Sequence, residues 1–199
     1  MALPIIQPST KLLIFDCDGT IADSTPAHDL AWQTVIKRYD LPFTLQDLIH
    51  FNGMPVAQAL ASLEPTLSQS QRQAIGHEKE ALVYDYLDNV APITPMTELI
   101  KQQATSRPMV VISGGTRANV KKTLHVLGLT SYFDLIITAD DAHPPKSRPE
   151  AFITIAEHFS IANEACQVFE DSARAMINAL KANMQVTDVR TLHTPGHTP

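Results

Sequence analysis

Two acidic pairs directly follow short apolar runs of the kind that form buried strands. Asp16 and Asp18 come after the run at 11–15, and Glu170 and Asp171 come after a run near the other end of the chain. Clustered carboxylates offer the hard oxygen ligands that Mg²⁺ prefers, and one carboxylate can also act as a nucleophile. The acids therefore predict a magnesium site with a nucleophilic side chain.

Groups suited to holding phosphate follow two other apolar runs. Ser113 and Gly114 come directly after the run at 109–112, and Lys146 lies in the loop after the run at 135–138. A hydroxyl, backbone N–H groups and a lysine charge are suitable donors to phosphoryl oxygens. An anionic nucleophile that attacks an anionic phosphate also needs a cation between them, so the clusters together predict Mg²⁺-dependent cleavage of a phosphate ester.

Each cluster also has an ordinary structural interpretation. Asp18-Gly19 is a frequent turn sequence, 113–115 suits a strand-to-helix turn, and 170–172 suits the start of a helix. Lys146 by itself is typical of a solvated surface lysine. It is the combination of the four clusters that favours catalysis.

The elements expected to position these groups are alternating strands and helices. Apolar, β-branched or aromatic runs recur along the chain at 11–15, 109–112, 135–138, 167–169 and 185–189. Helical periodicity separates the later runs, and this alternation predicts an α/β, doubly wound parallel-sheet (Rossmann-like) core. Ligands bind at the carboxyl ends of the strands in such sheets, so the four clusters are expected to converge.

A long helical stretch interrupts the alternation after the first strand. Residues from about 28 to 87 have helical periodicity without a strand run, which is too long for a crossover. We therefore expect an inserted helical cap at 25–92, a core made of 1–24 and 93–190, and a loose tail at 191–199. Such a cap can close over a site as a lid.

Composition disfavours several other classes of protein. The 199 residues, 44% hydrophobic and 18% charged, are typical of an ordinary globular protein. The net charge of −6 and scattered basic residues disfavour nucleic acid as a partner, and no apolar run is long enough to span a membrane. Cys17 and Cys166 suit reduced, packed thiols, and the acids beside Cys17 disfavour a catalytic thiolate. Because the first residues lack a secretion signal, we expect a cytoplasmic protein. We also expect it to be a monomer and to act on a small-molecule phosphate ester.

The four clusters, taken with their neighbours, resemble the motifs of the haloacid dehalogenase superfamily of phosphohydrolases. IFDCDGT at 14–20, VISGG at 111–115, PPKSRP at 144–149 and VFEDS at 168–172 are similar to its four motifs, in order. The resemblance extends over nearly the whole chain, and it implies a helical cap directly after the first motif.

The resemblance implies a role for each motif residue. Asp16 would be the nucleophile that forms an aspartyl-phosphate, and Asp18 the general acid for the leaving alcohol and then the base for water. Three residues would hold phosphate: Ser113, Gly114 and Lys146. Four would hold Mg²⁺: Asp16 and Asp171 through carboxylates, Asp18 through its backbone carbonyl, and Glu170 as direct or water-mediated support.

Within the superfamily, three further segments resemble the β-phosphoglucomutase-like branch, especially its bacterial fructose-1-phosphate phosphatases. They are DSTPAHDLAW at 23–32, FNGMP at 51–55 and VTDVRTL at 186–192. This likeness implies a sugar phosphate as substrate and three cap residues that face it: His28, Trp32 and Lys79. From the residues alone, Trp32 is typical of a cap core and Lys79 of a solvated helix charge.

Departures from the branch bear on the reaction. Met54-Pro55-Val56 stands where the mutase carries an Arg, which disfavours a mutase. No Lys occurs between Lys37 and Lys79, which disfavours phosphonate hydrolysis through a Schiff base. Asn183 stands at the glycine position of a common Ala-Gly-Met sequence, a change that alters packing or loop shape. Hydrolysis is therefore favoured, with a β-phosphoglucomutase-type mutase and a phospho-acceptor signalling or binding module as the alternatives.

Overall fold

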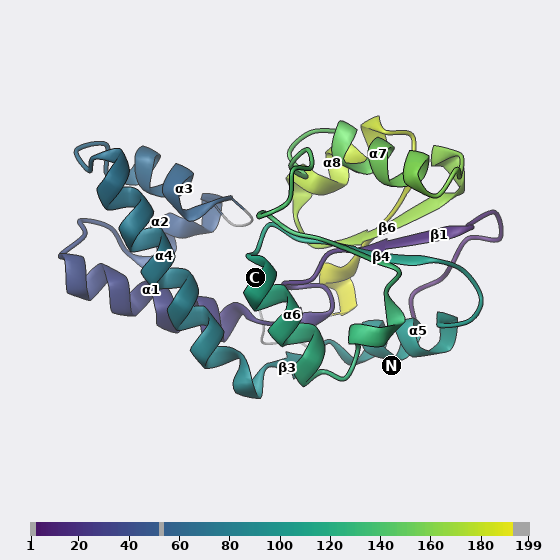
Figure 1. Ribbon diagram of the computed structural model, residues 1–199, viewed down its shortest axis with the longest axis horizontal. Helices are drawn as coiled ribbons and strands as arrows, with labels where there is room; N and C mark the ends of the chain where they lie inside the picture. Colours follow the sequence, from purple (N-terminus) through teal and green to yellow (C-terminus); the bar gives the residue numbers. More distant parts are fainter. Residues whose placement is uncertain (1–2, 52–53, 193–199) are drawn as a thin grey trace.

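The computed structural model describes residues 3–51 and 54–192, which form a sheet-based core and a helical part beside it (Figure 1). Five parallel strands make the sheet: β1 (Leu12–Phe15), β4 (Met109–Ile112), β5 (Leu135–Ile137), β6 (Cys166–Glu170) and β7 (Gln185–Asp188). Their order is β5-β4-β1-β6-β7, with β1 in the centre. The predicted α/β doubly wound core is therefore confirmed.

Helices cover both faces of this sheet, which explains why its central strands are continuous apolar runs. Leu12 and Ile14 face α7 (Glu150–His158) and α8 (Ala173–Lys181) in one buried cluster. Residues 13 and 15 face α5 (Thr94–Gln103) and α6 (Arg117–Val126) in a second cluster. Figure 1 shows the two pairs of helices on opposite sides of the strands. Short 3₁₀ turns complete the core: η3 (Thr130–Tyr132), η4 (Asn163–Ala165) and η5 (Val189–Leu192).

The helical part leaves and re-enters the core through two short strands. β2 (Ala22–Asp23) and β3 (Ala91–Pro92) pair in antiparallel fashion. The chain between them forms four helices and two 3₁₀ turns: α1 (Thr25–Tyr39), α2 (Leu45–Leu48), η1 (Ile49–Phe51), α3 (Val56–Leu63), α4 (Gln69–Tyr86) and η2 (Leu87–Asn89). A separate apolar cluster, which includes Val35, Leu60 and Ile75, holds these helices together. We call the segment from α1 to η2 the cap.

The departure at Asn183 has a local structural explanation. Asn183 follows α8 and has a φ of 62°, in the left-handed region, and its backbone N–H donates to the Leu180 carbonyl at 2.9 Å. Asn tolerates this region better than other residues with a side chain, so it can stand where glycine is common. The turn that leads from α8 into β7 is thereby formed without glycine.

Secondary structure extends to Leu192, further along the chain than expected. Because η5 includes Thr191 and Leu192, and Leu192 packs against the second core cluster, the prediction of a loose tail from residue 191 is wrong for these two residues. The rest of that segment, residues 193–199, lies outside the described residues. Cys17 and Cys166 are buried and form no disulfide. None of the helices formed by the described residues has an apolar stretch of the length needed to cross a bilayer.

Candidate active site

The strand order brings the four polar clusters to one edge of the sheet. Asp16 follows the central strand β1, whose Phe15 is level with Val111 of β4 and with Phe169 of β6. Ser113, which follows β4, and Glu170, which ends β6, therefore lie on either side of Asp16. The loop after β5 brings Lys146 to the same place, where its ammonium donates to the Asp16 carboxylate.

Lys146 is the cation that balances part of the buried negative charge. Its Nζ pairs with Asp16 Oδ1 and lies 2.9 Å from Glu170 Oε2, and Asp16 and Glu170 are 4% and 0% exposed. Burial alone would lower the pKa of Lys146, but the two carboxylates outweigh it and raise that pKa above its ordinary value. Lys146 is therefore a charged donor held at the base of the site.

Three carboxylates gather around this one lysine. Asp16, Glu170 and Asp171 each offer an oxygen, and these oxygens lie within 4.8 Å of one another. Burial, followed by the charge of Glu170, raises the pKa of Asp16 to about 7; burial and the charge of Asp16 do the same for Asp171. The group is short of positive charge and consists of hard oxygen donors, so it fits a Mg²⁺ ion.

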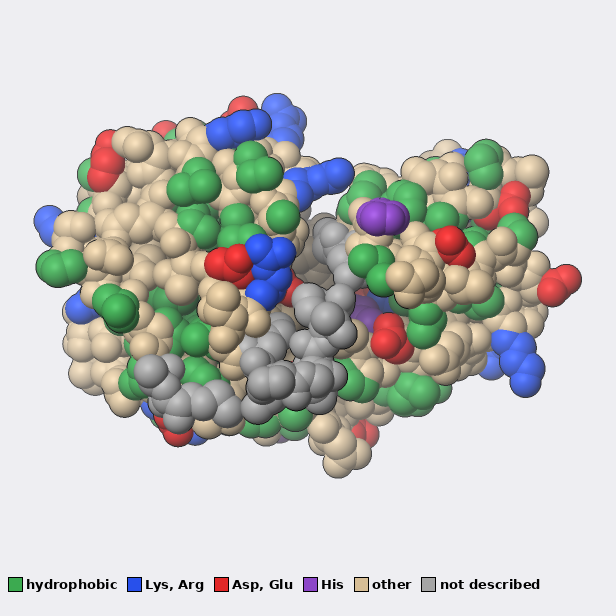
Figure 2. Space-filling model, turned by 180° about the vertical axis from the view of Figure 1, so that it is seen from behind, with side chains coloured by type: hydrophobic (Ala, Val, Ile, Leu, Met, Phe, Trp, Pro, Cys, Tyr) green, Lys and Arg blue, Asp and Glu red, His purple; other side chains and the backbone are tan. Residues whose placement is uncertain are grey.

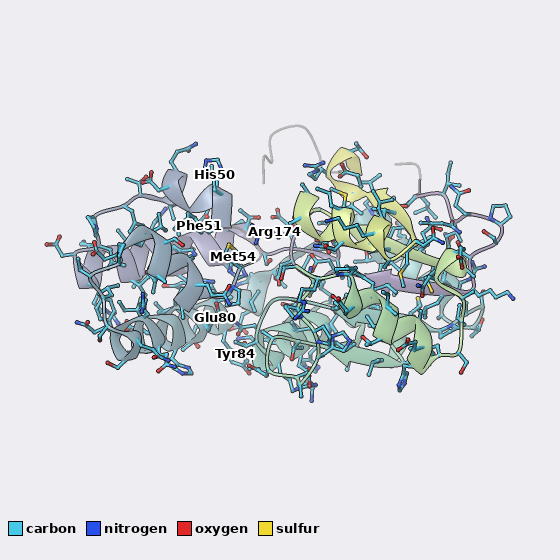
Figure 3. The ribbon with its side chains drawn as sticks, turned by 90° about the horizontal axis from the view of Figure 1, so that it is seen from above. His50, Phe51, Met54, Glu80, Tyr84 and Arg174 are labelled. Atoms are coloured by element: carbon cyan, nitrogen blue, oxygen red, sulfur yellow. The ribbon has the colours of Figure 1, made fainter. Side chains whose placement is uncertain are left out.

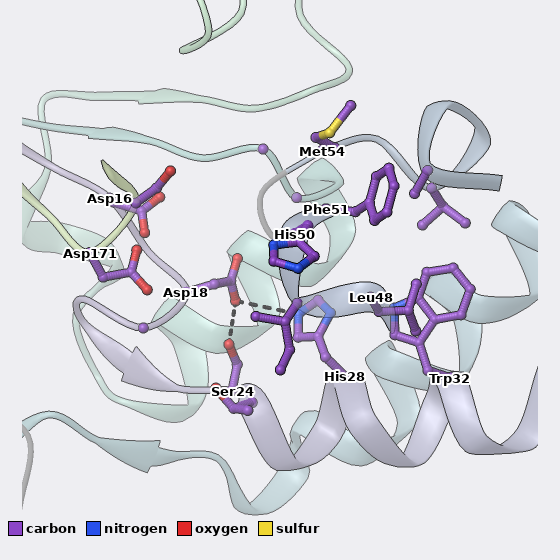
Figure 4. A pocket seen from close by; sticks show the side chains of 18 of the residues that line it. Asp16, Asp18, Ser24, His28, Trp32, Leu48, His50, Phe51, Met54 and Asp171 are labelled. Carbon is purple, nitrogen blue, oxygen red and sulfur yellow. Dashed lines mark hydrogen bonds and ion pairs between the residues drawn. The ribbon is translucent and has the colours of Figure 1, made fainter. Parts of the chain in front are cut away.

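Asp18 has different partners from Asp16. Its Oδ1 accepts a hydrogen bond from Ser24 Oγ at 2.6 Å, its Oδ2 accepts one from Ser113 Oγ at 3.3 Å, and His28 Nε2 lies 3.7 Å from Oδ1 (Figure 4). Burial would raise the pKa of Asp18, but His28 and the Ser24 hydroxyl outweigh it and lower that pKa below its ordinary range. The Asp18 carboxylate therefore faces the cap and does not belong to the metal-binding group of Asp16, Glu170 and Asp171. Its backbone carbonyl as a Mg²⁺ ligand stays a prediction.

Gly19 permits the close approach of the first and fourth motifs. It has a φ of 77°, and a Cβ at this position would lie 2.2 Å from Asp171 Oδ2. Any larger residue would displace the Asp171 carboxylate or the loop that carries Asp16 and Asp18. The glycine of the first motif is thus required by the position of an acid in the fourth.

The three predicted cap residues lie together above Asp18. Lys79 is only 3% exposed, and its Nζ lies 2.7 Å from His28 Nδ1 and 5.6 Å from the centre of the Trp32 ring. The interpretation of Lys79 as a solvated charge is therefore wrong, because α4 packs that side chain against α1. Trp32 both packs against the apolar cluster of the cap and lines the cleft.

A cleft of about 740 Å³ lies between the core and the cap. Figure 2 shows acidic, basic and histidine side chains around the hollow between the two parts. The structure brings together in its walls all ten residues predicted for the site: Asp16, Asp18, His28, Trp32, Lys79, Ser113, Gly114, Lys146, Glu170 and Asp171.

Further residues for which the sequence predicted no role also line the cleft. Ser24 precedes α1 in a pattern typical of a helix cap, yet its hydroxyl makes no capping bond and instead donates to Asp18. His50 and Phe51 of the cap and Arg174 of α8 lie on opposite sides of the opening (Figure 3). His50 and Arg174 lie outside the quoted motifs, and Phe51 lies in FNGMP without an implied role, because the position of all three depends on how the cap sits on the core.

Comparison with known proteins identifies the family. The sequence profile of the haloacid dehalogenase-like hydrolases matches residues 13–189, which is most of the chain. The chain therefore belongs to the haloacid dehalogenase-like hydrolase family, as the motifs predicted. It is an enzyme fold in which the cleft described above is the expected site of hydrolysis.

Individual relatives give a finer comparison. The chain is similar to a fructose-1-phosphate phosphatase of Escherichia coli (strain K12), with 36% identity over 184 residues that cover 90% of this chain and 96% of the relative. It is 26% identical to the β-phosphoglucomutase of Bacillus subtilis (strain 168), over 86% of this chain and 79% of the relative. Among solved structures, the β-phosphoglucomutase of Clostridium difficile shares the fold with a TM-score of 0.77 and 19% identity, over 90% and 84% of the two chains.

Proposed function

We propose that the protein hydrolyses a small sugar phosphate similar to fructose-1-phosphate, through a covalent phosphate on Asp16. One observation carries this proposal: Asp16 and Asp18 line the same cleft from one short loop, but separate partners hold them apart. Asp16 is fixed by Lys146, and Asp18 by Ser24 and Ser113. Two carboxylates in different environments can take the two roles that phosphate transfer requires, nucleophile and acid.

In the first step an Asp16 oxygen attacks phosphorus, and the bond from phosphorus to the sugar oxygen breaks. Protonated Asp18 gives its proton to that oxygen, so the sugar leaves as an alcohol. Lys146, the Ser113 hydroxyl and the N–H of Gly114 would hold the phosphoryl oxygens during transfer. Because Asp18 is ionised in the resting site, an incoming phosphate dianion must raise its pKa by charge repulsion for this step.

In the second step Asp18 takes a proton from water, and the water oxygen attacks phosphorus. Phosphate leaves, and the Asp16 carboxylate is restored. Mg²⁺ bound by Asp16 and Asp171, with Glu170 and the Asp18 carbonyl in support, would keep Asp16 ionised and reduce its repulsion of phosphate. Closure of the cap over the cleft would limit the entry of bulk water.

The sugar part of the substrate is supported by the cap wall and by the relatives. Trp32 offers an aromatic surface, and the polar side chains of His28 and Lys79 lie beside it. Similar proteins include the fructose-1-phosphate phosphatase and a phosphorylated carbohydrates phosphatase of Thermotoga maritima. We infer that the cap selects the sugar and the core performs the chemistry.

The test is phosphate release from a panel of sugar phosphates, with and without Mg²⁺, by the native enzyme and by Asp16→Asn. The panel includes fructose-1-phosphate and β-glucose-1-phosphate. We expect Mg²⁺-dependent release that falls at least about 10⁴-fold in Asp16→Asn, since this variant lacks the nucleophile. Conversion of glucose-1-phosphate to an isomer without phosphate release would indicate a mutase. A phosphorylated Asp16 without turnover would indicate a signalling module.

A further inference from the structure

A series of partly buried polar contacts connects core helix α6 to Asp18 through the cap. We propose that Glu80 and Asn119 are positioning residues that hold Lys79, and through it His28, in the orientation that supports proton transfer by Asp18. This inference rests on the proposed function, in which Asp18 is the general acid. It assigns a role to two residues outside the four motifs.

The first link joins the core to the cap. Asn119 of α6 is 6% exposed, and its Nδ2 donates to Glu80 Oε2 at 2.7 Å and to the Glu80 backbone carbonyl at 3.2 Å. One amide group thus holds both the backbone and the carboxylate of the same residue in α4. The position of Glu80 is set by the core, although it belongs to the cap (Figure 3).

The second link fixes a buried charge. Glu80 Oε1 accepts a hydrogen bond from Lys79 Nζ at 2.9 Å, and Lys79 is almost fully buried. A buried ammonium is costly unless it is paired, and among the described residues Glu80 is the acid within ion-pairing distance of Lys79. Glu80 therefore pairs with the Lys79 ammonium and orients its remaining N–H groups.

The third link determines which nitrogen of His28 carries a proton. A lysine ammonium has donors only, so His28 Nδ1, at 2.7 Å from Lys79 Nζ, must be the acceptor. The proton of the neutral ring is then on Nε2, which is the atom that faces Asp18 Oδ1 at 3.7 Å (Figure 4). A shift of about 0.5–1 Å would bring this N–H into hydrogen-bonding distance of the carboxylate.

These contacts fix the orientation in which Asp18 gives up its proton. A donor held toward Oδ1 fixes the carboxyl group, so that its other oxygen carries the proton toward the leaving sugar oxygen. Loss of Glu80 or Asn119 would leave His28 free to turn or change tautomer. The rate should then fall for substrates that need a proton on the leaving group and fall little for those that do not.

Lys122 provides a matched control at the same helix pair. Its Nζ donates to the Tyr84 carbonyl at 2.6 Å and pairs with Asp88 at 2.8 Å, so it also connects α6 with the end of the cap. None of its contacts leads to His28. If the variants acted by a general loosening of the cap, Lys122→Ala would behave like the others. If they act through the contacts from Asn119 to His28, Lys122→Ala should leave the rate unchanged.

The experiment measures kcat/KM with Mg²⁺ for Glu80→Gln, Asn119→Leu, the double variant and Lys122→Ala. One substrate is the best sugar phosphate of the native enzyme, and the other is 4-nitrophenyl phosphate, whose nitrophenolate leaves without a proton. The value of kcat/KM reports the steps up to release of the alcohol. We expect Glu80→Gln and Asn119→Leu to lower it about tenfold for the sugar phosphate and under about twofold for the nitrophenyl ester. The kcat/KM of the double variant should be no lower than that of the poorer single variant, because both substitutions act through the same series of contacts.

Three results would overturn the inference: equal losses on both substrates, no loss on either, or the same selective loss in Lys122→Ala. Native enzyme and Asp18→Asn are assayed beside the variants. Selective loss of sugar phosphate turnover in Asp18→Asn would support the proposed function independently of Glu80 and Asn119. A native enzyme that releases phosphate from no sugar ester would refute the proposed function, and the inference with it.

Discussion

At the scale of single residues, the site is defined by buried acids that outnumber the positive charges paired with them. Asp16, Glu170 and Asp171 share one lysine, and burial raises the pKa of each of the three above its ordinary value. Without a metal ion, the folded protein therefore holds protons that the unfolded chain would release. This excess of protons makes stability depend on pH in a definite direction.

We expect the metal-free protein to become less stable as pH rises from about 4 to about 7. The pKa of Asp16 and of Asp171 is raised from 3.8 to about 7, so between these values the folded state binds more protons than the unfolded state. The free energy of unfolding then falls with rising pH. Thermal melting at pH 5.5 and 8, with a chelator present, measures the effect.

Added Mg²⁺ should raise the melting temperature more at pH 8 than at pH 5.5, because the ion competes with protons for the same oxygens. Asp16→Asn is the control, and it should melt with a smaller dependence on pH than the native protein in the metal-free state. An identical pH dependence for the two proteins would contradict the assignment of the raised pKa to Asp16.

At the scale of elements, the sequence predicted what depends on local pattern and missed what depends on docking. The five sheet strands are apolar runs, and the motif residues follow them, so strands and core site were both accessible. β2 and β3 have two residues each, too few to show a period. Asn119 and Glu80 lie on helices whose contact is set by the packing of α4 against α6, and no local signal marks them.

The turn after α8 gives a prediction at this scale. Asn183→Ala should lower the free energy of unfolding by about 1 kcal/mol, because alanine is strained at the φ of 62° that this position adopts. Urea denaturation followed by circular dichroism measures the change. Asn183→Gly removes the same hydrogen bond to Glu164 but adopts this φ without strain, so it should lose less. Equal losses in both variants would assign the effect to the hydrogen bond.

At the scale of the whole molecule, the cleft joins a core wall of charged groups to a cap wall in which apolar side chains stand beside polar ones. The groups expected to hold phosphate come from the core, and Trp32, Leu48 and Phe51 come from the cap. Binding of phosphate and choice of sugar are thereby separated in space. Changes in the cap wall should alter preference among sugars and leave the affinity for inorganic phosphate in place.

Phe51→Ala tests this separation. We expect the ratios of kcat/KM among sugar phosphates to change by at least about threefold, since the variant removes an apolar contact surface, while inhibition by inorganic phosphate changes under about twofold. Tyr86→Ala is the control, because Tyr86 lies at the far end of α4 and outside the cleft wall. A uniform loss on every sugar phosphate would contradict a role for Phe51 in selection.

The central position of β1 also has a consequence for the synthesis of the chain. Leu12 pairs with Cys166, so this strand, once it has left the ribosome, waits for about 150 further residues before its second neighbour exists. At ordinary rates of translation this takes roughly 8–30 s. Until then the run LLIF, which is fully buried in the finished protein, lacks one of its two neighbouring strands. The nascent chain should therefore depend on chaperones that shield apolar segments, and the active site cannot form before β6 has been made.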